Sequence, residues 1–371
     1  MESNSGIVTL HDIIERSARD GLDLQRDDGS FPPGRNYTYD EPETPVRTTS
    51  HWLLVLTKAY KISRETVFED AANSAIDYLL SDDVRPSGFT YHCRNVESKD
   101  KCNGLVGQAA PIRALARTSE VFERSDARET AEEVFRLHPF SEELGLWERV
   151  ETDGSTLSFD RTLNHQIIFS AAAAEIAPTV NIIEERIGNF LDHLSTNMRL
   201  HSNGLIKHYV RPRFIDTICS ISCAPRRRYD MLINEIAFHY YSYSDERRKK
   251  ERGYQTVNLN ALSKLKPIFP NHEFWRCEKL SRALDFVRDN ENDLIRGIDT
   301  KHGSLVQGIS IAKILHRFEG TSIEEHRERI VSDLCLETDT VFDILDIEGV
   351  DENTRIALVS VLTDLPDMDL P

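Results

Sequence analysis

Apolar residues recur at helical spacing along most of the chain, and they come in pairs of segments. Leu53, Leu56 and Tyr60 share one helix face, and after a short break at Ser63 the next set covers 68–79. Apolar residues three and four positions apart predict amphipathic helices, and a short break between two helices predicts an antiparallel hairpin. Five more pairs follow: 105–122 with 127–137, 163–176 with 182–194, 257–268 with 274–287, 305–318 with 323–334, and 341–345 with 354–362.

The spacing of these pairs is regular except at one place. The first helices begin near residues 49, 103, 161, 255 and 304, so one interval is longer than the others by about a helix. The excess lies at about 210–252, which contains a candidate helix over 229–243 and ten basic residues against six acidic ones. We interpret 1–371 as a single domain with a basic insertion at this point.

A glycine followed by alternating apolar and polar residues precedes several of the first helices, as in Gly88-Phe89-Thr90-Tyr91 and Gly145-Leu146-Trp147. Such segments predict short extended pieces after a turn. We therefore expect an all-α fold, an (α/α)6 toroid whose six first helices line a central cavity and whose extended loops gather at one end. The alternative is an open superhelical solenoid.

Charge and composition indicate the cellular environment of the protein and exclude some classes of ligand. The chain has 62 acidic and 45 basic residues, a net charge of -17, and the acidic excess is spread from Asp12 to Asp369. This resembles the salt-adapted surface of a halophile's proteins and disfavours a nucleic-acid ligand. No apolar run is long enough to span a membrane, and Met1 to Leu10 lacks the features of a signal peptide. We expect a cytoplasmic protein whose six cysteines are thiols.

Two carboxylates stand where first helices begin. Asp100 precedes Asn103-Gly104, and Asp160 precedes the segment with Asn164 and His165. An Asp before a helix is commonly an N-cap. Two of them at the same end of adjacent helices of the ring could instead face one cavity, and paired carboxyls with separated pKa values suit glycosyl transfer.

These segments resemble the six-hairpin glycosidase superfamily, and within it the unsaturated glucuronyl hydrolases. The likeness rests on residues 100–104, on Asp160-x-Thr162-x-Asn164 and on Gly204-Leu205-x-x-His208. It implies that Asp160 is the general acid/base, Asp100 its partner and His208 a substrate contact within the catalytic set. Gln255 matches that family's Arg-Gly-x-Gln segment.

Other stretches are similar to a family of archaeal surface-glycoprotein N-glycosylation proteins, the AglQ type. They include Asp28-Gly29-Ser30-Phe31, Thr49-Ser50-His51-Trp52 and 102–109, and the likeness covers about the first two thirds of the chain. It implies a role in building a surface-layer N-glycan that contains hexuronic acid.

The same loops hold further candidate substrate contacts. Planar guanidinium groups match the two oxygens of a sugar carboxylate, aromatic rings can stack on a pyranose, and histidines can exchange protons with a sugar carbon, as in the N-acylglucosamine 2-epimerases that this architecture resembles. The candidates are Arg47, Arg94, Arg149, Arg161, His51, His92, His165, Trp52, Trp147, Asn103, Asn164 and Gln255.

Several motifs are absent from the sequence. It has no dinucleotide-binding glycine fingerprint, no P-loop and no zincin motif. We expect no cofactor and no metal.

These observations leave two classes of function open. The first is a carbohydrate-active enzyme acting on a hexuronic acid sugar or a lipid- or nucleotide-linked glycan precursor, by hydrolysis or by isomerisation, alongside other glycosylation enzymes. In the hydrolytic version, burial raises the pKa of Asp160, which donates a proton while Asp100 orients water. The second class is a non-catalytic glycan-binding or scaffold protein.

Overall fold

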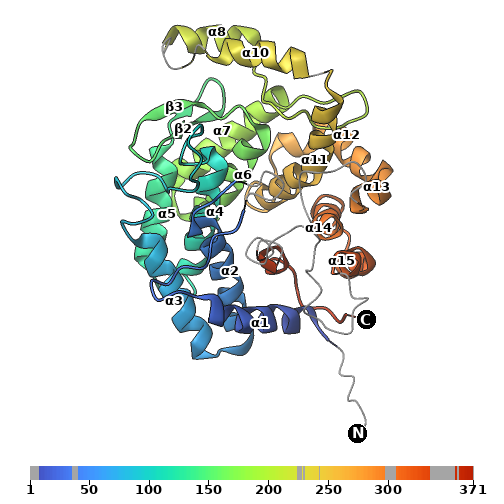
Figure 1. Ribbon diagram of the computed structural model, residues 1–371. Coiled ribbons are helices and arrows are strands. Elements are labelled where there is room, and N and C mark those ends of the chain that lie inside the picture. Colours follow the sequence, from blue (N-terminus) through green and yellow to red (C-terminus); the bar gives the residue numbers. More distant parts are fainter. Residues whose placement is uncertain are drawn as a thin grey trace.

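Helices arranged in a ring make up most of the computed structural model, which describes residues 8–35, 41–223, 228, 230–241, 243–296, 306–334, 356 and 359–370. Neighbouring inner helices follow one another in chain order (Figure 1): α2 (Pro45–Ser63), α4 (Gly104–Ser119), α6 (Leu163–Ala173), α11 (Asp245–Leu265) and α14 (Gln307–Glu319). Each is followed by an outer helix: α3 (Thr66–Leu80), α5 (Ser125–Leu137), α7 (Asn181–Asn197), α12 (Glu278–Asp289) and α15 (Arg327–Asp333). The predicted toroid of helical hairpins is confirmed.

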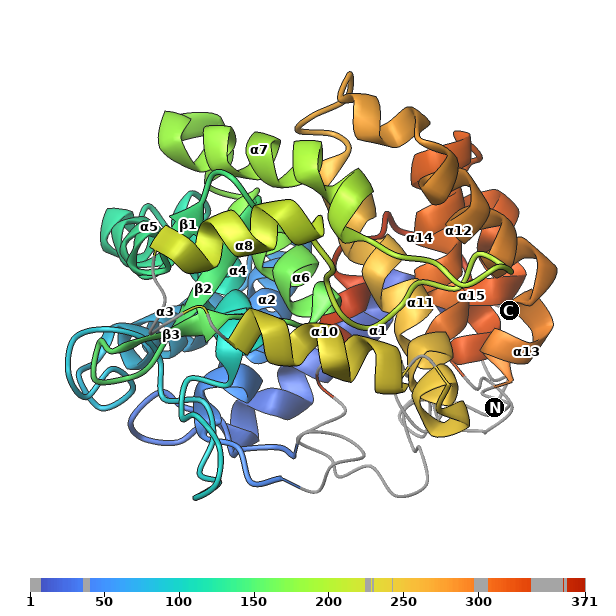
Figure 2. The same cartoon turned by 90° about the horizontal axis from the view of Figure 1, so that it is seen from above.

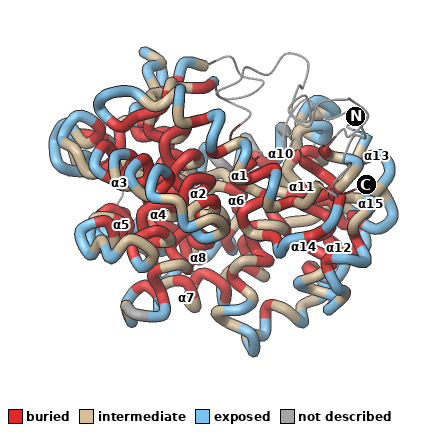
Figure 3. Tube along the Cα trace, turned by 90° about the horizontal axis from the view of Figure 1, so that it is seen from below, coloured by how far each residue is buried: buried red, intermediate tan, exposed pale blue. Residues whose placement is uncertain are grey.

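Burial separates the inner from the outer helices. The inner helix α4 buries residues on all its faces, including Gly107, Gln108 and Pro111, because it has neighbours on every side. The outer helix α5 buries only the stripe Ala127, Ala131, Val134 and Phe135, as expected for a helix with one face on the core. Figure 3 shows this contrast as buried positions concentrated along α2, α4 and α6.

One side chain on each of α2, α4, α6 and α11 anchors a preceding loop. The backbone N–H groups of Phe31, Tyr91, Trp147 and Ile206 each donate to a side-chain oxygen, which belongs to Thr49 (3.0 Å), Gln108 (2.8 Å), Gln166 (3.0 Å) and Gln255 (2.9 Å) respectively. The glycine-led segments seen in the sequence are these anchored loops. Before α6 the loop widens into an antiparallel sheet of β1 (Phe140–Ser141), β2 (Leu146–Val150) and β3 (Thr156–Phe159).

Segments near both chain ends meet where the ring closes, and only part of the second helix of the predicted sixth hairpin falls among the described residues. Residues 341–345 lie outside the described residues, and helical residues 359–362 lie between α14 and α2, where Ser360 Oγ is 3.0 Å from His51 Nδ1. α1 (Leu10–Gly21), which the periodicity search missed, packs on α2, and Leu10 N donates to Met368 O at 2.9 Å. A helix from the other end of the chain therefore supports the closing segment.

Asp364 fixes this closing segment to the ring. Its carboxylate forms ion pairs with Arg113 at 2.8 Å, Lys313 at 2.8 Å, Lys264 at 3.4 Å and Arg117. Burial would raise the pKa of Asp364, but these four cations hold it well below the usual value. They belong to three inner helices, so one carboxylate joins α4, α11 and α14.

The basic segment 210–252 contains two helices outside the ring, α8 (Phe214–Cys223) and α10 (Asp230–Tyr241), followed by the first turns of α11. The helix predicted over 229–243 is present as α10, and α8 was not predicted. Figures 1 and 2 place both helices at the edge of the molecule beside β2, β3 and α6. The remaining short elements are α13 (Glu291–Ile295) and the 3₁₀ turns Leu22–Leu24, Ala177–Thr179, Glu273–Arg276 and Glu324–His326. Within the described ranges, no helix combines the length and the apolar character needed to cross a bilayer.

Candidate active site

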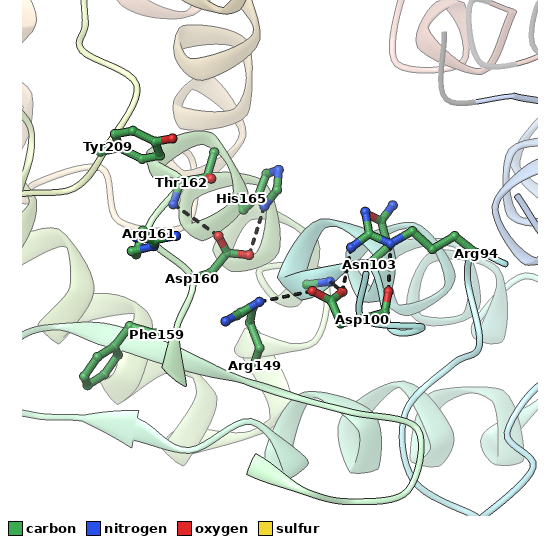
Figure 4. Close-up of a pocket in the computed structure, with 11 residues that line it drawn as sticks. Arg94, Asp100, Asn103, Arg149, Phe159, Asp160, Arg161, Thr162, His165 and Tyr209 are labelled. Carbon is green, nitrogen blue, oxygen red and sulfur yellow. Dashed lines mark hydrogen bonds and ion pairs between the residues drawn. The ribbon is translucent and has the colours of Figure 1, made fainter. Parts of the chain in front are cut away.

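A cavity of about 190 Å³ opens at the N-terminal ends of α4 and α6. Figure 4 shows its lining, which comes from both helices and from the loops that precede them. The lining residues are Arg94, Asp100, Asn103, Gly104, Arg149, Phe159, Asp160, Arg161, Thr162, His165 and Tyr209. Seven candidates from the sequence meet here: Arg94, Asp100, Asn103, Arg149, Asp160, Arg161 and His165.

Asp100 is the centre of an ion-pair network on one side of the cavity. Its carboxylate accepts from Arg94 Nη2 at 2.9 Å and from Arg149 Nη1 at 3.1 Å. It also accepts from the backbone N–H of Gly104 at 2.9 Å, which caps α4. A carboxylate held by two guanidinium groups and a helix amide is positioned to hold the loop and the arginines in place.

Asp160 lies on the other side and is paired with a histidine. His165 Nδ1 is 2.9 Å from Asp160 Oδ2, and the backbone N–H of Leu105 donates to the same oxygen at 3.2 Å. Asp160 therefore caps α4, the neighbouring helix. Gly104 makes this approach possible, because its φ is +59° and a Cβ there would lie 2.6 Å from Asp160 Oδ2.

The charge state of Asp160 contradicts the expectation of a raised pKa. Burial alone would raise the pKa, but His165, Arg149 and the Leu105 amide together lower it below its usual range. The N-terminus of α4 adds a favourable field for an anion. The contacts of Asp160 orient His165 and favour the ionised carboxylate over the protonated form that a general acid needs.

The pairing also fixes the tautomer of His165. An ionised carboxylate accepts, so the hydrogen-bond network assigns the proton to Nδ1 and leaves Nε2 as the acceptor. Nε2 has no hydrogen-bond partner among the described residues, and the imidazole lines the cavity. A carboxylate-oriented imidazole with a free Nε2 is the arrangement of a general base.

Arg161 is the arginine of the cavity with a free guanidinium. Arg94 and Arg149 are occupied by Asp100, whereas the Arg161 side chain makes no hydrogen bond or ion pair with the residues that the structure describes. A free, planar guanidinium beside a base suits a carboxylate or another anionic oxygen of a ligand.

His208 lies behind the cavity wall, next to Tyr209. Its ring packs against Tyr209 and Tyr254 at centroid distances of 4.9 Å and 5.6 Å. Burial lowers the pKa of His208 well below the usual value, and the cations of Lys250 and Arg247 lower it further. The backbone N–H of His208 donates to Glu251 at 2.9 Å. His208 is thus a neutral imidazole held next to the start of α6.

Three charged or titratable candidates lie away from the cavity lining. Arg47 forms an ion pair with buried Glu43 at 2.8 Å. His92 Nε2 lies 3.2 Å from Arg94 O, so this ring supports the loop of Asp100. Burial and nearby cations, Arg47 first, lower the pKa of His51 to about 3. These three residues have structural partners in the described part of the chain.

Four other candidates are core residues. Trp147 is fully buried among Phe135, Phe140, Phe169 and Phe190, so no sugar can stack on it. Trp52 is 6% exposed and stacks on Phe31 at 5.0 Å. Gln255 uses its amide for Ile206 N and Ala283 O, and Asn164 is buried. The predictions of substrate contact by Trp52, Trp147 and Gln255 are wrong, because these side chains anchor loops or fill the core.

The sequence reasoning missed Phe159, Thr162 and Tyr209 as lining residues. Thr162 and Tyr209 are joined by a β-bridge, which brings the loop after α7 to the start of α6. No short-range pattern connects residues 47 positions apart, so no sequence signal placed Tyr209 at the cavity. In the described parts of the chain, no group of three or more His, Cys, Asp or Glu side chains is arranged to hold a metal.

Comparison with known proteins gives a relative along nearly the whole length. The chain is 36% identical over 369 residues to archaeal glycosylation protein Q of Haloferax volcanii, covering 98% of this chain and 99% of that protein. The chain belongs to the family of archaeal glycosylation protein Q. No model of a known protein family matches it.

Solved structures share the fold of this glycosylation protein Q family member at low sequence identity. A D-mannose isomerase covers 96% of this chain and 97% of its own, with a TM-score of 0.59 and 14% identity. Cellobiose 2-epimerase of Spirochaeta thermophila covers 95% and 96%, with a TM-score of 0.58 and 12% identity. The α-1,6-mannanase of a Salegentibacter species covers 95% and 98%, with a TM-score of 0.54 and 12% identity. The fold is therefore that of the six-hairpin toroids.

Proposed function

We propose that the protein is a sugar isomerase or epimerase that acts on an anionic sugar of the hexuronic acid class. The Asp160–His165 pair carries this proposal, because it places an oriented imidazole in a cavity that also holds the free guanidinium of Arg161. The cavity lining contains three arginines and two aspartates, so it is less acidic than a chain with a net charge of -17. That balance favours an anionic ligand.

The chemistry follows from these groups. His165 Nε2 removes a proton from the carbon next to a sugar carbonyl, and the electron pair moves to the carbonyl oxygen to give an enediolate. Asp160 stabilises the imidazolium that forms, and Arg161 stabilises the oxygen anion. Return of the proton to the former carbonyl carbon, with the hydroxyl proton of the deprotonated carbon moving to the former carbonyl oxygen, gives isomerisation. Return to the opposite face of the original carbon gives epimerisation. Isomerisation needs only His165, which can return the proton that it removed, and His208 is assigned no proton transfer because its ring lies behind the cavity wall.

Hydrolysis is less well supported by the geometry. Glycosidases of the two-carboxylate type need one carboxylic acid that is protonated before reaction. The pKa of Asp160 is lowered, and Asp100 is held by two guanidinium groups. Neither carboxylate is arranged as a proton donor.

The comparisons support a role for the reaction in glycan assembly. The Haloferax relative is named for archaeal glycosylation, and two proteins with this fold are named as an isomerase and an epimerase. We propose that the sugar belongs to a surface-layer N-glycan or its lipid- or nucleotide-linked precursor. The cytoplasmic location and the salt adaptation expected from the sequence remain predictions.

Mass spectrometry of candidate sugars after incubation with the protein in deuterium oxide tests the proposal. The panel contains hexuronates that are free, nucleotide-linked and part of short glycans, at high salt. The expected result is deuterium on a carbon of the sugar, without cleavage of a glycosidic bond. Bond cleavage with solvent oxygen in the product would contradict it and restore the hydrolase, and specific binding without exchange or cleavage would favour a glycan-binding protein.

A further inference from the structure

The two helices outside the ring have their polarity reversed. In α8, Thr217 and Ser220 are buried at 2% and 1% exposure, whereas Phe214 and Ile215 are exposed at 65% and 63%. A helix of a soluble domain ordinarily turns its apolar stripe to the core and its polar stripe to water. In α8 the polar stripe faces the protein and the apolar stripe faces outward.

The neighbouring helix α10 extends this apolar surface. Leu232, Ile233, Ile236 and Tyr240 occupy one helical stripe and are exposed, while Met231 and Phe238 face the protein. We call the exposed set the docking face: Phe214, Ile215, Ile218, Leu232, Ile233, Ile236, Tyr240 and Tyr243. Eleven large apolar side chains are exposed among the described residues, and eight of them lie here. Such clustering marks an interaction surface.

The charge around the docking face has the opposite sign to the rest of the chain. Residues 207–252 contain eleven basic and six acidic side chains, in a chain with a net charge of -17. Arg213 and Arg248 border the helices, with side chains 66% and 53% exposed, and they pair with Asp216 at 2.6 Å and Asp245 at 3.9 Å. Exposed apolar residues on short helices bordered by Lys and Arg are typical of helices that lie in a bilayer interface.

We infer that the docking face binds the surface of an anionic lipid bilayer, with α8 and α10 lying flat in the interface. Apolar side chains would enter the acyl boundary, Tyr240 and Tyr243 would lie at the headgroup level, and the bordering cations would meet anionic headgroups.

The docking face is connected directly to the candidate active site. Tyr209 lines the cavity, and α8 begins five residues later at Phe214. Arg228, between α8 and α10, forms a 3.0 Å ion pair with Glu148, which is next to the cavity residue Arg149. Binding to a bilayer would hold the cavity near the membrane surface, where a lipid-linked glycan is presented. The inference does not depend on which reaction the cavity performs.

Flotation of the full chain with lipid vesicles tests this inference. Vesicles of phosphatidylglycerol and of phosphatidylcholine are compared at about 0.15 M and about 1 M salt, where the screening length falls from roughly 8 to 3 Å. The double variant Ile215→Ser with Ile236→Ser is compared with a control double variant, Val67→Ser with Ile182→Ser, at exposed apolar positions on α3 and α7. Circular dichroism confirms that each variant is folded.

The expected result is flotation of the wild-type chain with phosphatidylglycerol vesicles, at least about tenfold weaker flotation of the docking-face variant, and no change in the control. The preference for phosphatidylglycerol over phosphatidylcholine should shrink at the higher salt. Absence of flotation, or equal flotation of both double variants, would overturn the inference. A halved solution mass of the docking-face variant in light scattering would also overturn it, by assigning the face to a second copy of the chain.

Discussion

Asp160 and Asp364 occupy opposite ends of the ring, and both carboxylates have a lowered pKa, but their surroundings differ. Both carboxylates line a cavity, of about 190 Å³ at Asp160 and about 290 Å³ at Asp364. Asp160 accepts from one imidazole and from backbone amides. Asp364 is held by four cations from three inner helices. Along α4, the start of the helix and Arg117 are separated by roughly 20 Å at 1.5 Å per residue.

These different surroundings assign catalysis to the Asp160 end of the ring and closure of the ring to the Asp364 end. At the Asp160 end, the partner of the carboxylate is an imidazole that lines the cavity and whose Nε2 has no partner among the described residues. At the Asp364 end, the partners are two arginines and two lysines, and burial and neighbouring cations lower the pKa of Lys264 to about 7. Asp160 thus orients one imidazole, whereas Asp364 joins three helices of the ring.

The largest expected effect is at the Asp160 end. The substrate is a sugar that takes up deuterium in the exchange experiment. Replacement His165→Asn should lower its turnover by about 10²- to 10⁴-fold, which is the usual contribution of general acid–base catalysis. Steady-state kinetics measures this loss. His193→Asn on the outer helix α7 is the matched control and should keep wild-type turnover, and an equal loss in both variants would remove His165 from the mechanism.

The next largest effect is at the Asp364 end. Asp364→Asn leaves four cations without their carboxylate and should lower the free energy of unfolding by about 3–5 kcal/mol, as breaking a buried ion pair does. Urea unfolding measures it. Turnover per folded molecule should remain unchanged. A stable Asp364→Asn variant would show that other contacts close the ring.

This stability difference should depend on pH. The folded-state pKa of Asp364 lies below its unfolded value, so its contribution is fully present above about pH 4 and is lost as the pH falls toward the folded pKa. The unfolding free energies of wild type and Asp364→Asn should therefore converge below about pH 4 and differ above it. A difference that grows on acidification would contradict the ion-pair account.

A smaller effect is expected for the free guanidinium of the cavity. Arg161→Ala should raise KM for a carboxylated sugar by about 10- to 100-fold, since a charge-assisted hydrogen bond contributes about 1.5–3 kcal/mol. Arg213→Ala, at an exposed arginine of α8's border, is the control. A neutral sugar should bind both variants like wild type, and an unchanged KM in Arg161→Ala would mean that the ligand's charge is recognised elsewhere.

The smallest effect concerns Gln255. Gln255→Ala should lower the free energy of unfolding by about 1–3 kcal/mol, because Ile206 N and Ala283 O lose their buried partner. The kcat/KM of the folded variant should stay at the wild-type value. Loss of substrate affinity without loss of stability would instead support the sugar contact expected from the sequence.

Local periodicity was enough to predict most of the ring. The helices α2 to α7 follow from apolar spacing, because each buries its face on a neighbour close in sequence. Closure could not be predicted in the same way. Leu10, Ile13, Ile14 and Ala18 of α1 have helical spacing, but the segment they support lies more than 300 residues later.

The candidate site was predicted in part for a similar reason. Asp100, Asp160 and His165 lie at helix starts that the sequence indicates, and they do meet in one cavity. The direction of the pKa shift of Asp160 was wrong, because the lowering by His165, and then by Arg149 and Leu105 N, outweighs the effect of burial. Trp147 follows a glycine turn like a ligand-facing aromatic, yet Gln166 holds its backbone and turns the ring into the core.

Solvent deuterium exchange into a responsive sugar, measured side by side for wild type, Asp160→Asn and Asp364→Asn, tests the central claim most directly. The account predicts that Asp160→Asn stays folded and loses carbon–deuterium exchange, while Asp364→Asn is less stable and keeps wild-type exchange per folded molecule. Undiminished exchange in Asp160→Asn, or its loss in folded Asp364→Asn, would contradict the assignment of chemistry to one end of the ring and closure to the other.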